Sequence, residues 1–311
     1  MVVPTRDRIA LVRQAVRSAL REGSADIEVI VVDDGSVQSV SGQLGETGDG
    51  RLRVERHQVP RGRSAARNTG ISLARGRWVA FLDDDDVWAP DKLSHQLAEA
   101  ARTGAAWAYA GDVVVDEQLS ILAGHPPLSP GDAMASLGRY NTIPAGASNV
   151  IVRRDLLEAV GGFDADLHRA EDWDLWLRLA RHGTPAVVRR PLVGYRMRFG
   201  HGEVDAARII AEPDLLAARH AIEVDRQAVR RRAGWTCLLA NQRGSAARHY
   251  LHAAARGDLR SFARAAIALA HPSGSAPALF RRFVPRDATW EAEAQAWLTD
   301  LKASLAAEHT P

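Results

Sequence analysis

Hydrophobic residues follow two different spacings in the first 200 residues of the chain. Short, largely apolar runs predict strands over 27–32, 52–54 and 78–82. Between these runs, apolar residues recur every three to four positions, which predicts amphipathic helices over 8–22 and 64–75. Strands that alternate with helices are typical of an α/β fold, in which ligands bind beyond the carboxyl ends of the strands.

The pattern changes beyond about residue 202, where Ala, Arg and Leu dominate and strand-like runs disappear. Helical spacing there predicts helices over 205–222, 225–241, 243–256, 258–270 and 288–307. We therefore expect two domains: an α/β nucleotide-binding domain over 1–204, and an α-helical, Arg- and Ala-rich C-terminal extension over 205–311.

Composition places the chain among ordinary globular proteins. Of its 311 residues, 46% are hydrophobic and 25% are charged, which excludes the disordered, collagen-like and low-complexity classes. The single cysteine, Cys237, excludes an internal disulfide framework and fits a reducing compartment. No apolar run approaches the ~18 residues that a membrane-spanning helix needs, and the first four residues leave no room for a signal peptide. We expect a cytoplasmic protein.

Four consecutive aspartates, residues 83–86, follow the strand predicted over 78–82. Adjacent carboxylates repel one another, so such a cluster is costly unless a cation lies among them. Oxygen ligands at a strand end suit Mg²⁺ or Mn²⁺. The alternative is a solvated acidic turn before the helix that follows Asp91.

A second carboxylate-bearing turn, Asp-Asp-Gly-Ser over 33–36, ends another predicted strand. If the two strands are parallel, this turn lies on the same sheet edge, where a carboxylate can accept a hydrogen bond from a nucleobase. The alternative is a plain Asp-Gly turn. Arg63 and Arg67 lie four positions apart, hence on one helix face, and guanidinium groups suit phosphate. The alternative for this pair is a solvated helix surface.

Three acidic residues, Glu171, Asp172 and Asp174, open a predicted helix that follows the Gly-Gly-Phe-Asp segment over 161–164. The helix dipole stabilises negative charge at this end. An aspartate that is held ionised at the mouth of an apolar pocket is placed to act as a general base. The alternative is simple capping of the helix N-terminus.

In this order and spacing, the motifs resemble those of the family 2 glycosyltransferases, which have the GT-A fold. The resemblance covers residue 2 to about residue 198, nearly two-thirds of the chain, through segments 3–8, 31–36, 66–71, 81–88, 161–164 and 171–179. It implies an α/β, Rossmann-like GT-A catalytic domain over 1–204 with the helical extension after it. Only Val2 and Val3 precede Pro4, so either the family's first strand is truncated here or the start lies upstream.

The resemblance also implies an activity and its partners. The enzyme would be inverting and metal-dependent, and would move a sugar from a nucleotide-diphosphate sugar to a hydroxyl of a glycan or lipid-linked acceptor. Such reactions serve cell-surface polysaccharide or glycoconjugate synthesis. A sugar nucleotidyltransferase of the same fold would need a Gly-rich, Lys-bearing phosphate loop near the N-terminus, and none is present. A non-catalytic nucleotide-sugar-binding or scaffold protein of the same fold stays as the alternative.

The resemblance implies roles for individual residues. Asp172 would be the base that deprotonates the acceptor hydroxyl, Asp85 the main ligand of Mn²⁺ or Mg²⁺ in a D-x-D motif, and Asp34 the partner of the nucleobase. The remaining substrate-binding residues it implies are Pro4, Thr5 and Arg6 around the nucleoside, Asp83 or Asp84 near the ribose, and Arg63, Arg67, Trp88, Phe163, Glu171, Trp173, Arg198 and His201. Arg63 and Arg67 would bind phosphate, and either Arg198 or His201 would contact the diphosphate. For the aromatic residues, core packing is the alternative.

The C-terminal region has its own charge pattern. Net charge is only +2, but residues 226–286 hold 12 basic residues and one acid, Asp258. Arginines alternate there with apolar residues, namely Phe262, Ile267, Leu269, Leu279, Phe280, Phe283 and Val284. This pattern is compatible with peripheral contact with the inner face of a membrane that carries lipid-linked acceptors. The alternative is packing against the first domain with the arginines outward. Nucleic-acid binding is not expected, because no recognition motif accompanies the charge.

Overall fold

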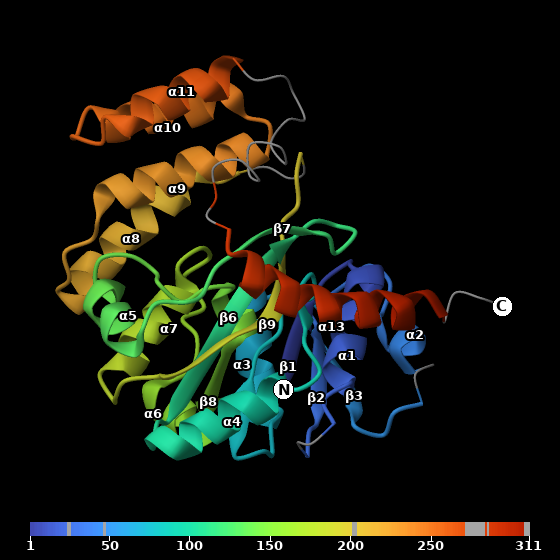
Figure 1. Cartoon of the computed structure of the whole chain (residues 1–311). Helices are drawn as coiled ribbons and strands as arrows, with labels where there is room; N and C mark the ends of the chain where they lie inside the picture. Colours follow the sequence, from blue (N-terminus) through green and yellow to red (C-terminus); the bar gives the residue numbers. More distant parts are fainter. Residues whose placement is uncertain (24–25, 46–47, 201–203, 271–283, 285, 308–311) are drawn as a thin grey trace. The chain divides into compact units, whose positions relative to one another are not determined.

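The chain forms two compact units in the computed structural model, which describes residues 1–23, 26–45, 48–200, 204–270, 284 and 286–307 (Figure 1). The first unit comprises Met1–Met134, Ile143–Arg196 and Pro285–Pro311, and the second comprises Ala135–Thr142 and Met197–Val284. The candidate site lies in the first unit, so its sheet is described first.

Three parallel strands form one edge of the fold: β1 (Val2–Thr5), β2 (Val29–Asp33) and β3 (Leu52–Arg56), in the order β1-β2-β3. Their register places Thr5 opposite Asp33 and Asp33 opposite Arg56, so the three carboxyl ends lie side by side. The strands form because β1 and β2 consist mainly of buried Val and Ile, which suit a sheet covered on both faces.

The strand before the acidic cluster, β4 (Trp78–Ala80), ends close to the carboxyl ends of these strands. Phe81 bridges Val2 in parallel, and the backbone N–H of Leu82 donates to the carbonyl oxygen of Val2 over 3.1 Å. Residues 83–86 therefore follow at the end of the fold where β1 and β2 finish, as the sequence predicted.

A second sheet has the order β4-β8-β6-β9-β5, with β7 paired to β6. Its further strands are β5 (Val87–Trp88), β6 (Trp107–Val115), β7 (Ile121–Gly124), β8 (Val150–Arg153) and β9 (Ala186–Arg196). Parallel β6 and β9 are flanked by antiparallel partners, which gives the mixed α/β architecture.

Helices pack against these strands. The helices along this part of the chain are α1 (Ile9–Leu20), α2 (Ser41–Gly45), α3 (Arg63–Leu73), α4 (Lys92–Thr103), α5 (Pro130–Leu137), α6 (Arg154–Val160) and α7 (Glu171–Ala180), with the 3-10 helix η1 (Gly146–Asn149). Helix α3 approaches β1 so closely at Gly70 that a Cβ there would lie 2.2 Å from Cγ1 of Val2. This close approach brings the first turn of α3 beside the end of β1.

The last helix, α13 (Ala288–Ala307), belongs to the first unit, whereas the sequence pattern predicts 288–307 as part of the helical extension. Its buried stripe packs against β9 and β7, and consists of Trp290, Ala294, Trp297, Leu298 and Leu301. The indole N–H of Trp290 donates to the carbonyl oxygen of Asp112 and that of Trp297 to the carbonyl oxygen of Pro191, each over 2.8 Å. Helical spacing predicts such a stripe but does not say which surface it covers.

The second unit is helical, as expected, with α8 (Ala206–His220), α9 (Arg226–Leu239), α10 (Arg243–Ala254) and α11 (Arg260–Ala270). Its small core consists of Cys237, Leu238, Ala246, Ala247, Tyr250, Ala265 and Ala268. Within the described ranges, no helix is both long and apolar enough to cross a bilayer. Leu279, Phe280 and Phe283 lie outside the described residues.

Candidate active site

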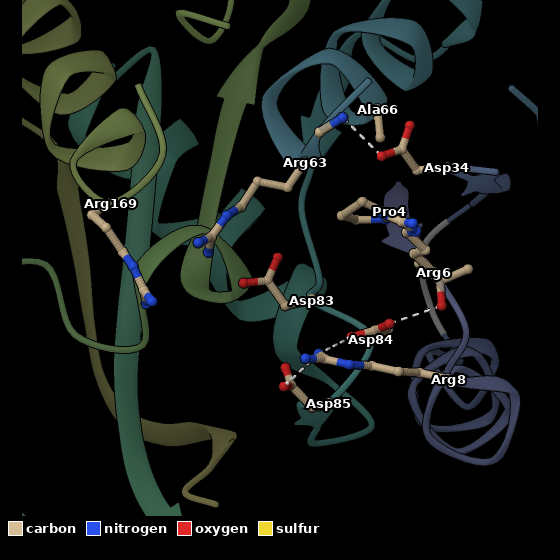
Figure 2. Close-up of a pocket in the computed structure, with 12 residues that line it drawn as sticks. Pro4, Arg6, Arg8, Asp34, Arg63, Ala66, Asp83, Asp84, Asp85 and Arg169 are labelled. Carbon is tan, nitrogen blue, oxygen red and sulfur yellow. Dashed lines mark hydrogen bonds and ion pairs between the residues drawn. The ribbon is translucent and has the colours of Figure 1, made fainter. Parts of the chain in front are cut away.

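A cavity of about 540 Å³ lies in the first unit where β1, β2 and β4 end (Figure 2). Its lining residues are Pro4, Thr5, Arg6, Arg8, Asp34, Gly62, Arg63, Ala66, Asp83, Asp84, Asp85 and Arg169. Seven of these, from the opening loop, the Asp34 turn and the acidic turn over 83–86, were predicted site residues: Pro4, Thr5, Arg6, Asp34, Asp83, Asp84 and Asp85. Arg63 was also predicted, and Arg8, Gly62, Ala66 and Arg169 were not.

Asp34 forms a fixed wall of the cavity. Its Oδ1 accepts hydrogen bonds from Nδ1 of His57 over 2.7 Å and from the backbone N–H of Arg61 over 2.8 Å, and its Oδ2 accepts from the N–H of Gly62 over 2.8 Å. Burial alone would raise the pKa of Asp34, but these hydrogen bonds outweigh it and hold the pKa below its ordinary value. The carboxylate is therefore ionised and held in one orientation.

In the acidic turn, residues 83–86, the carboxylates of Asp84 and Asp85 both contact the Arg8 guanidinium. Nη1 of Arg8 lies 3.0 Å from Oδ1 of Asp84 and 3.0 Å from Oδ2 of Asp85, as Figure 2 shows. Burial, together with repulsion from Asp85, raises the pKa of Asp84 to about 6, and burial and Asp83 raise the pKa of Asp85. One guanidinium does not balance these charges, so the turn favours further positive charge.

The fourth aspartate of the cluster, Asp86, anchors the turn. It is only 1% exposed, and it accepts hydrogen bonds from Oγ of Ser148 over 2.5 Å and from the backbone N–H of Arg196 over 2.8 Å. Oγ of Ser148 in turn accepts from the N–H of Asp83 over 2.9 Å. Asp86 therefore ties the turn to η1 and β9.

Arg67 connects the acidic turn to the start of α7. Its side chain is 2% exposed, with Nη2 2.5 Å from Oδ1 of Asp83 and Nη1 3.2 Å from Oε1 of Glu171. The guanidinium also lies over the ring of Phe163. Burial would raise the pKa of Asp83, but Arg67 outweighs it and holds that pKa below its ordinary value. Arg67, expected to bind phosphate, does not line the cavity, because Phe163 and two carboxylates enclose it.

Two arginines line the cavity beyond the acidic turn. In Figure 2 the side chains of Arg63 and Arg169 extend on the side away from Asp34. Nη2 of Arg63 donates to the carbonyl oxygen of His168 over 2.8 Å, and its Nε lies 3.2 Å from Oε1 of Glu171. These contacts hold the Arg63 guanidinium in one orientation. The cavity is thus bounded by Asp34 at one side and by guanidinium groups at the other.

Asp172 lies in the first turn of α7 and is half-buried. Its Oδ1 accepts a hydrogen bond from the backbone N–H of Trp173 over 2.7 Å. Gly146 leaves room beside this carboxylate, since a Cβ there would lie 3.2 Å from Oδ2 of Asp172. Neither Asp172 nor Glu171 lines the cavity, although both contribute to the negative surroundings of Arg67.

The predicted aromatic contacts lie in the core instead. Trp88, Phe163 and Trp173 are 1%, 2% and 4% exposed, and none lines the cavity. The indole N–H of Trp88 donates to the carbonyl oxygen of Ser148 over 2.8 Å, so this side chain supports η1. Arg198 belongs to the second unit, and His201 lies outside the described residues.

The donor set of the turn suits a hard divalent cation. Asp84 and Asp85 already reach one cationic group, the Arg8 guanidinium, through carboxylate oxygens. Among the described residues, no three His, Cys, Asp or Glu side chains come together in a cluster that could hold a metal ion. A Mg²⁺ ion held jointly with substrate phosphates usually takes only one or two protein carboxylates, and the oxygens of Asp84 and Asp85 fit that pattern.

The raised pKa of Asp84 predicts a pH dependence of stability. Because the folded-state pKa of about 6 exceeds the ordinary 3.8, the folded protein binds more protons between these values, and its free energy of unfolding falls as pH rises through them. Asp84→Asn removes the repulsion from Asp85, so its stability relative to wild type should increase from pH 4 to 6 and level off above. Thermal unfolding in EDTA measures this. A difference that does not change with pH would contradict it.

Comparisons with known proteins identify the family. The model of the family described as Glycosyl transferase family 2 matches residues 1–161. The chain is 29% identical over 206 residues to the putative colanic acid biosynthesis glycosyl transferase WcaA of Escherichia coli K12, covering 65% of this chain and 72% of that one. It is 21% identical over 208 residues to an E. coli β-1,3-glucosyltransferase, WfgD, covering 66% and 79%.

The fold is also shared with solved structures. Residues 1–349 of TarS from S. aureus, crystallised with UDP-GlcNAc, match with a TM-score of 0.54 at 17% identity, covering 85% of this chain and 89% of that one. This similarity confirms the predicted GT-A fold. Together with the family match, which spans more than half of the chain and contains the Asp34 turn and the acidic turn, it shows that the chain is a glycosyltransferase belonging to glycosyl transferase family 2.

Proposed function

We propose that this enzyme is an inverting, metal-dependent glycosyltransferase that moves a sugar from a nucleotide-diphosphate sugar to a hydroxyl of a glycan or lipid-linked acceptor. The observation that carries the proposal is the polarity of the 540 Å³ cavity: a fixed carboxylate, Asp34, at one side, and the acidic turn with Arg63 and Arg169 at the other. A nucleotide diphosphate has the matching polarity, with hydrogen-bond donors on its base and negative charge on its phosphates.

The relatives support this class of donor and acceptor. The name of WfgD describes a UDP-Glc donor and an α-D-GlcNAc-diphosphoundecaprenol acceptor, and TarS was crystallised with UDP-GlcNAc. For the present enzyme, Asp34 would accept from the base, while Pro4 and Thr5 border the nucleoside. Arg63 and Arg169 would neutralise phosphate oxygens, a task for which the planar guanidinium is suited.

The acidic turn would hold the cation. Asp85, with Asp84 beside it, would be the principal protein ligand, and Mn²⁺ or Mg²⁺ fits their oxygen donors. When bound, the divalent ion supplies electrostatic stabilisation of the negative charge that develops on the leaving diphosphate. Asp86 and Ser148 keep the turn in place, so the two carboxylates need little rearrangement to bind a cation.

Asp172 would be the general base. From the first turn of α7, its carboxylate would accept the proton of the acceptor hydroxyl as that oxygen attacks the anomeric carbon. The new C–O bond forms on the face of the anomeric carbon opposite the diphosphate. The bond from this carbon to the diphosphate breaks, and its electron pair stays on the phosphate oxygen. Attack from the opposite face inverts the anomeric configuration.

Thermal shifts with nucleotides test the donor and metal parts of the proposal. UDP, GDP, dTDP and CDP are each added with and without Mn²⁺ to the wild type, to Asp85→Ala, and to Asp166→Ala as an exposed-carboxylate control. We expect a metal-dependent stabilisation by one nucleotide, lost in Asp85→Ala and retained in Asp166→Ala. An Asp85→Ala protein with an unchanged Mn²⁺ titration refutes the ligand assignment, and no shift with any nucleotide refutes the donor assignment.

A further inference from the structure

A second cavity, of about 570 Å³, lies within the helical unit among α9, α10 and α11. Its lining residues are Arg231, Arg232, Trp235, Leu238, Tyr250, Arg260, Ala263, Arg264, Ile267 and Val284. The volume lies within the range of about 300–1,000 Å³ that is usual for small-molecule sites. Nothing in the sugar-transfer chemistry above uses this cavity, since every residue proposed for that chemistry lies in the first unit.

The wall of this cavity is apolar and its rim is cationic. Trp235, Tyr250 and Ile267 belong to or pack against the small core of the unit and offer an apolar surface. Arg232 and Arg260 are exposed, and neither guanidinium group forms a hydrogen bond or ion pair with the residues that the structure describes. A ligand that suits both features has an apolar part and an anionic part.

The charge balance around the cavity leaves this cationic character uncompensated. Residues 226–270 contain nine arginines and a single acid, Asp258. Oδ2 of Asp258 is shared, 3.1 Å from Nη1 of Arg231 and 3.2 Å from Nη1 of Arg264. Nη2 of Arg231 also lies 3.9 Å from Oδ2 of Asp225, just before this stretch, whereas the guanidinium groups of Arg232 and Arg260 pair with no carboxylate among the described residues. Guanidinium groups in this number suit phosphate, which they bind through paired, charge-assisted hydrogen bonds.

An exposed apolar stripe beside the cavity indicates where such a ligand comes from. On and just before α11, Leu259 is 71%, Phe262 52% and Leu269 56% exposed. Their spacing of three and seven places them on one helix face, next to the face that carries the cavity residues Ala263 and Ile267. Exposed apolar side chains beside arginines are typical of a surface that meets the headgroup region of a bilayer.

We propose that this cavity binds one membrane lipid phosphate, with the phosphate on Arg232 and Arg260 and the adjoining hydrocarbon against Trp235 and Ile267. The stripe of Leu259, Phe262 and Leu269 would rest in the membrane surface from which the lipid enters. This site does not depend on the proposed function of the first unit. It would hold the enzyme at the membrane even in the absence of donor.

Binding of dodecyl phosphate below its critical micelle concentration tests the cavity by calorimetry on the full chain. Two compounds serve as controls: inorganic phosphate, which has the anionic headgroup without the alkyl chain, and dodecyl maltoside, which has the alkyl chain with an uncharged headgroup. We expect binding of dodecyl phosphate only. Binding of inorganic phosphate with equal affinity, or of dodecyl maltoside with equal affinity, would overturn the proposal, because either result shows that one half of the lipid does not contribute.

Two matched pairs of variants locate the binding. Arg232→Gln with Arg260→Gln should weaken dodecyl phosphate binding about tenfold or more. Arg248→Gln with Arg256→Gln removes the same charge from exposed arginines outside the cavity and should leave affinity within about twofold. Equal weakening by both pairs would mean diffuse attraction and overturn the site. Circular dichroism and thermal unfolding verify that each variant is folded.

A second pair of variants tests the apolar wall without changing the charge. Ala263→Trp, at an exposed position that lines the cavity, should block binding, whereas Ala266→Trp, exposed on α11 outside the cavity, should not.

Flotation with phosphatidylcholine vesicles, with and without phosphatidic acid, then tests whether the lipid comes from a membrane. We expect recovery with phosphatidic acid vesicles only, lost in Ala263→Trp. Recovery that Ala263→Trp leaves unchanged would overturn the proposal.

Discussion

Asp172→Asn is expected to lower turnover by about 100-fold or more while leaving donor affinity nearly unchanged. Asparagine keeps the size of the side chain and the oxygen that accepts from the backbone N–H of Trp173, so the first turn of α7 is preserved. What it removes is the ability to accept the proton of the acceptor hydroxyl. Initial rates with saturating donor, together with a nucleotide titration of the same protein, measure the two quantities separately.

Asp166→Asn is the matched control for this prediction, because Asp166 is an exposed carboxylate in the loop that leads to α7. Its turnover should equal that of the wild type. Near-normal turnover in Asp172→Asn would remove Asp172 from the chemistry.

Most of the site's position at the carboxyl ends of the strands could be predicted, because neighbouring residues in the sequence mark these strands and turns. A run of buried Val and Ile predicts β2, and the Asp34 turn and the acidic turn follow predicted strands directly, whereas β1 was expected only from the resemblance to the family. Once these strands are parallel, their carboxyl ends meet by geometry alone. The same argument applies to the first turn of α7, whose acidic residues mark a helix start in the sequence as clearly as in the fold.

The role of each side chain within the site was less predictable. A spacing of four places Arg63 and Arg67 on one face of α3. Nothing in the sequence says that Phe163 and Glu171, about 100 positions later, bury Arg67 while Arg63 stays exposed. The same holds for His57, which reaches Asp34 from another strand end, and for Arg169, which stands in a loop without any motif. These positions depend on long-range contacts, for which a single sequence carries no local signal.

Burial of the aromatic residues follows the same logic. Trp88 and Trp173 flank motifs that the sequence connects with substrate, yet both side chains fill the core behind those motifs. A large apolar side chain next to a functional turn gains more from burial than from exposure, so proximity in the sequence does not make it a binding residue. In the motif that contains Trp88, the residues that line the cavity are Asp83, Asp84 and Asp85.

Arg67→Met is expected to destabilise the protein by about 3–5 kcal/mol, the range found when one partner of a buried ion pair is removed. Met keeps much of the side-chain volume and its contact with Phe163, but it leaves Glu171 and Asp83 without their shared cation. Urea unfolding at pH 7 measures the loss. Arg63→Met is the control, because Arg63 also reaches Glu171 while its side chain is 48% exposed, and we expect a loss of no more than about 1 kcal/mol.

The pH dependence of the stability of Arg67→Met tests whether the loss comes from the ion pairs of Arg67. Arg67 holds the pKa of Asp83 below its ordinary value, so its contribution is present above the unfolded-state pKa of Asp83 and is lost as pH falls through the folded-state value. In Arg67→Met, burial without this cation raises the pKa of the Asp83 carboxyl above its ordinary value, so the carboxyl takes up a proton above pH 4 and the deficit should shrink as pH falls from 7 toward 4. Adding Glu171→Gln to Arg67→Met should recover part of the stability at pH 7. A deficit that is independent of pH and unaffected by Glu171→Gln would show that Arg67 acts through packing alone and that no ion pair connects the acidic turn to α7.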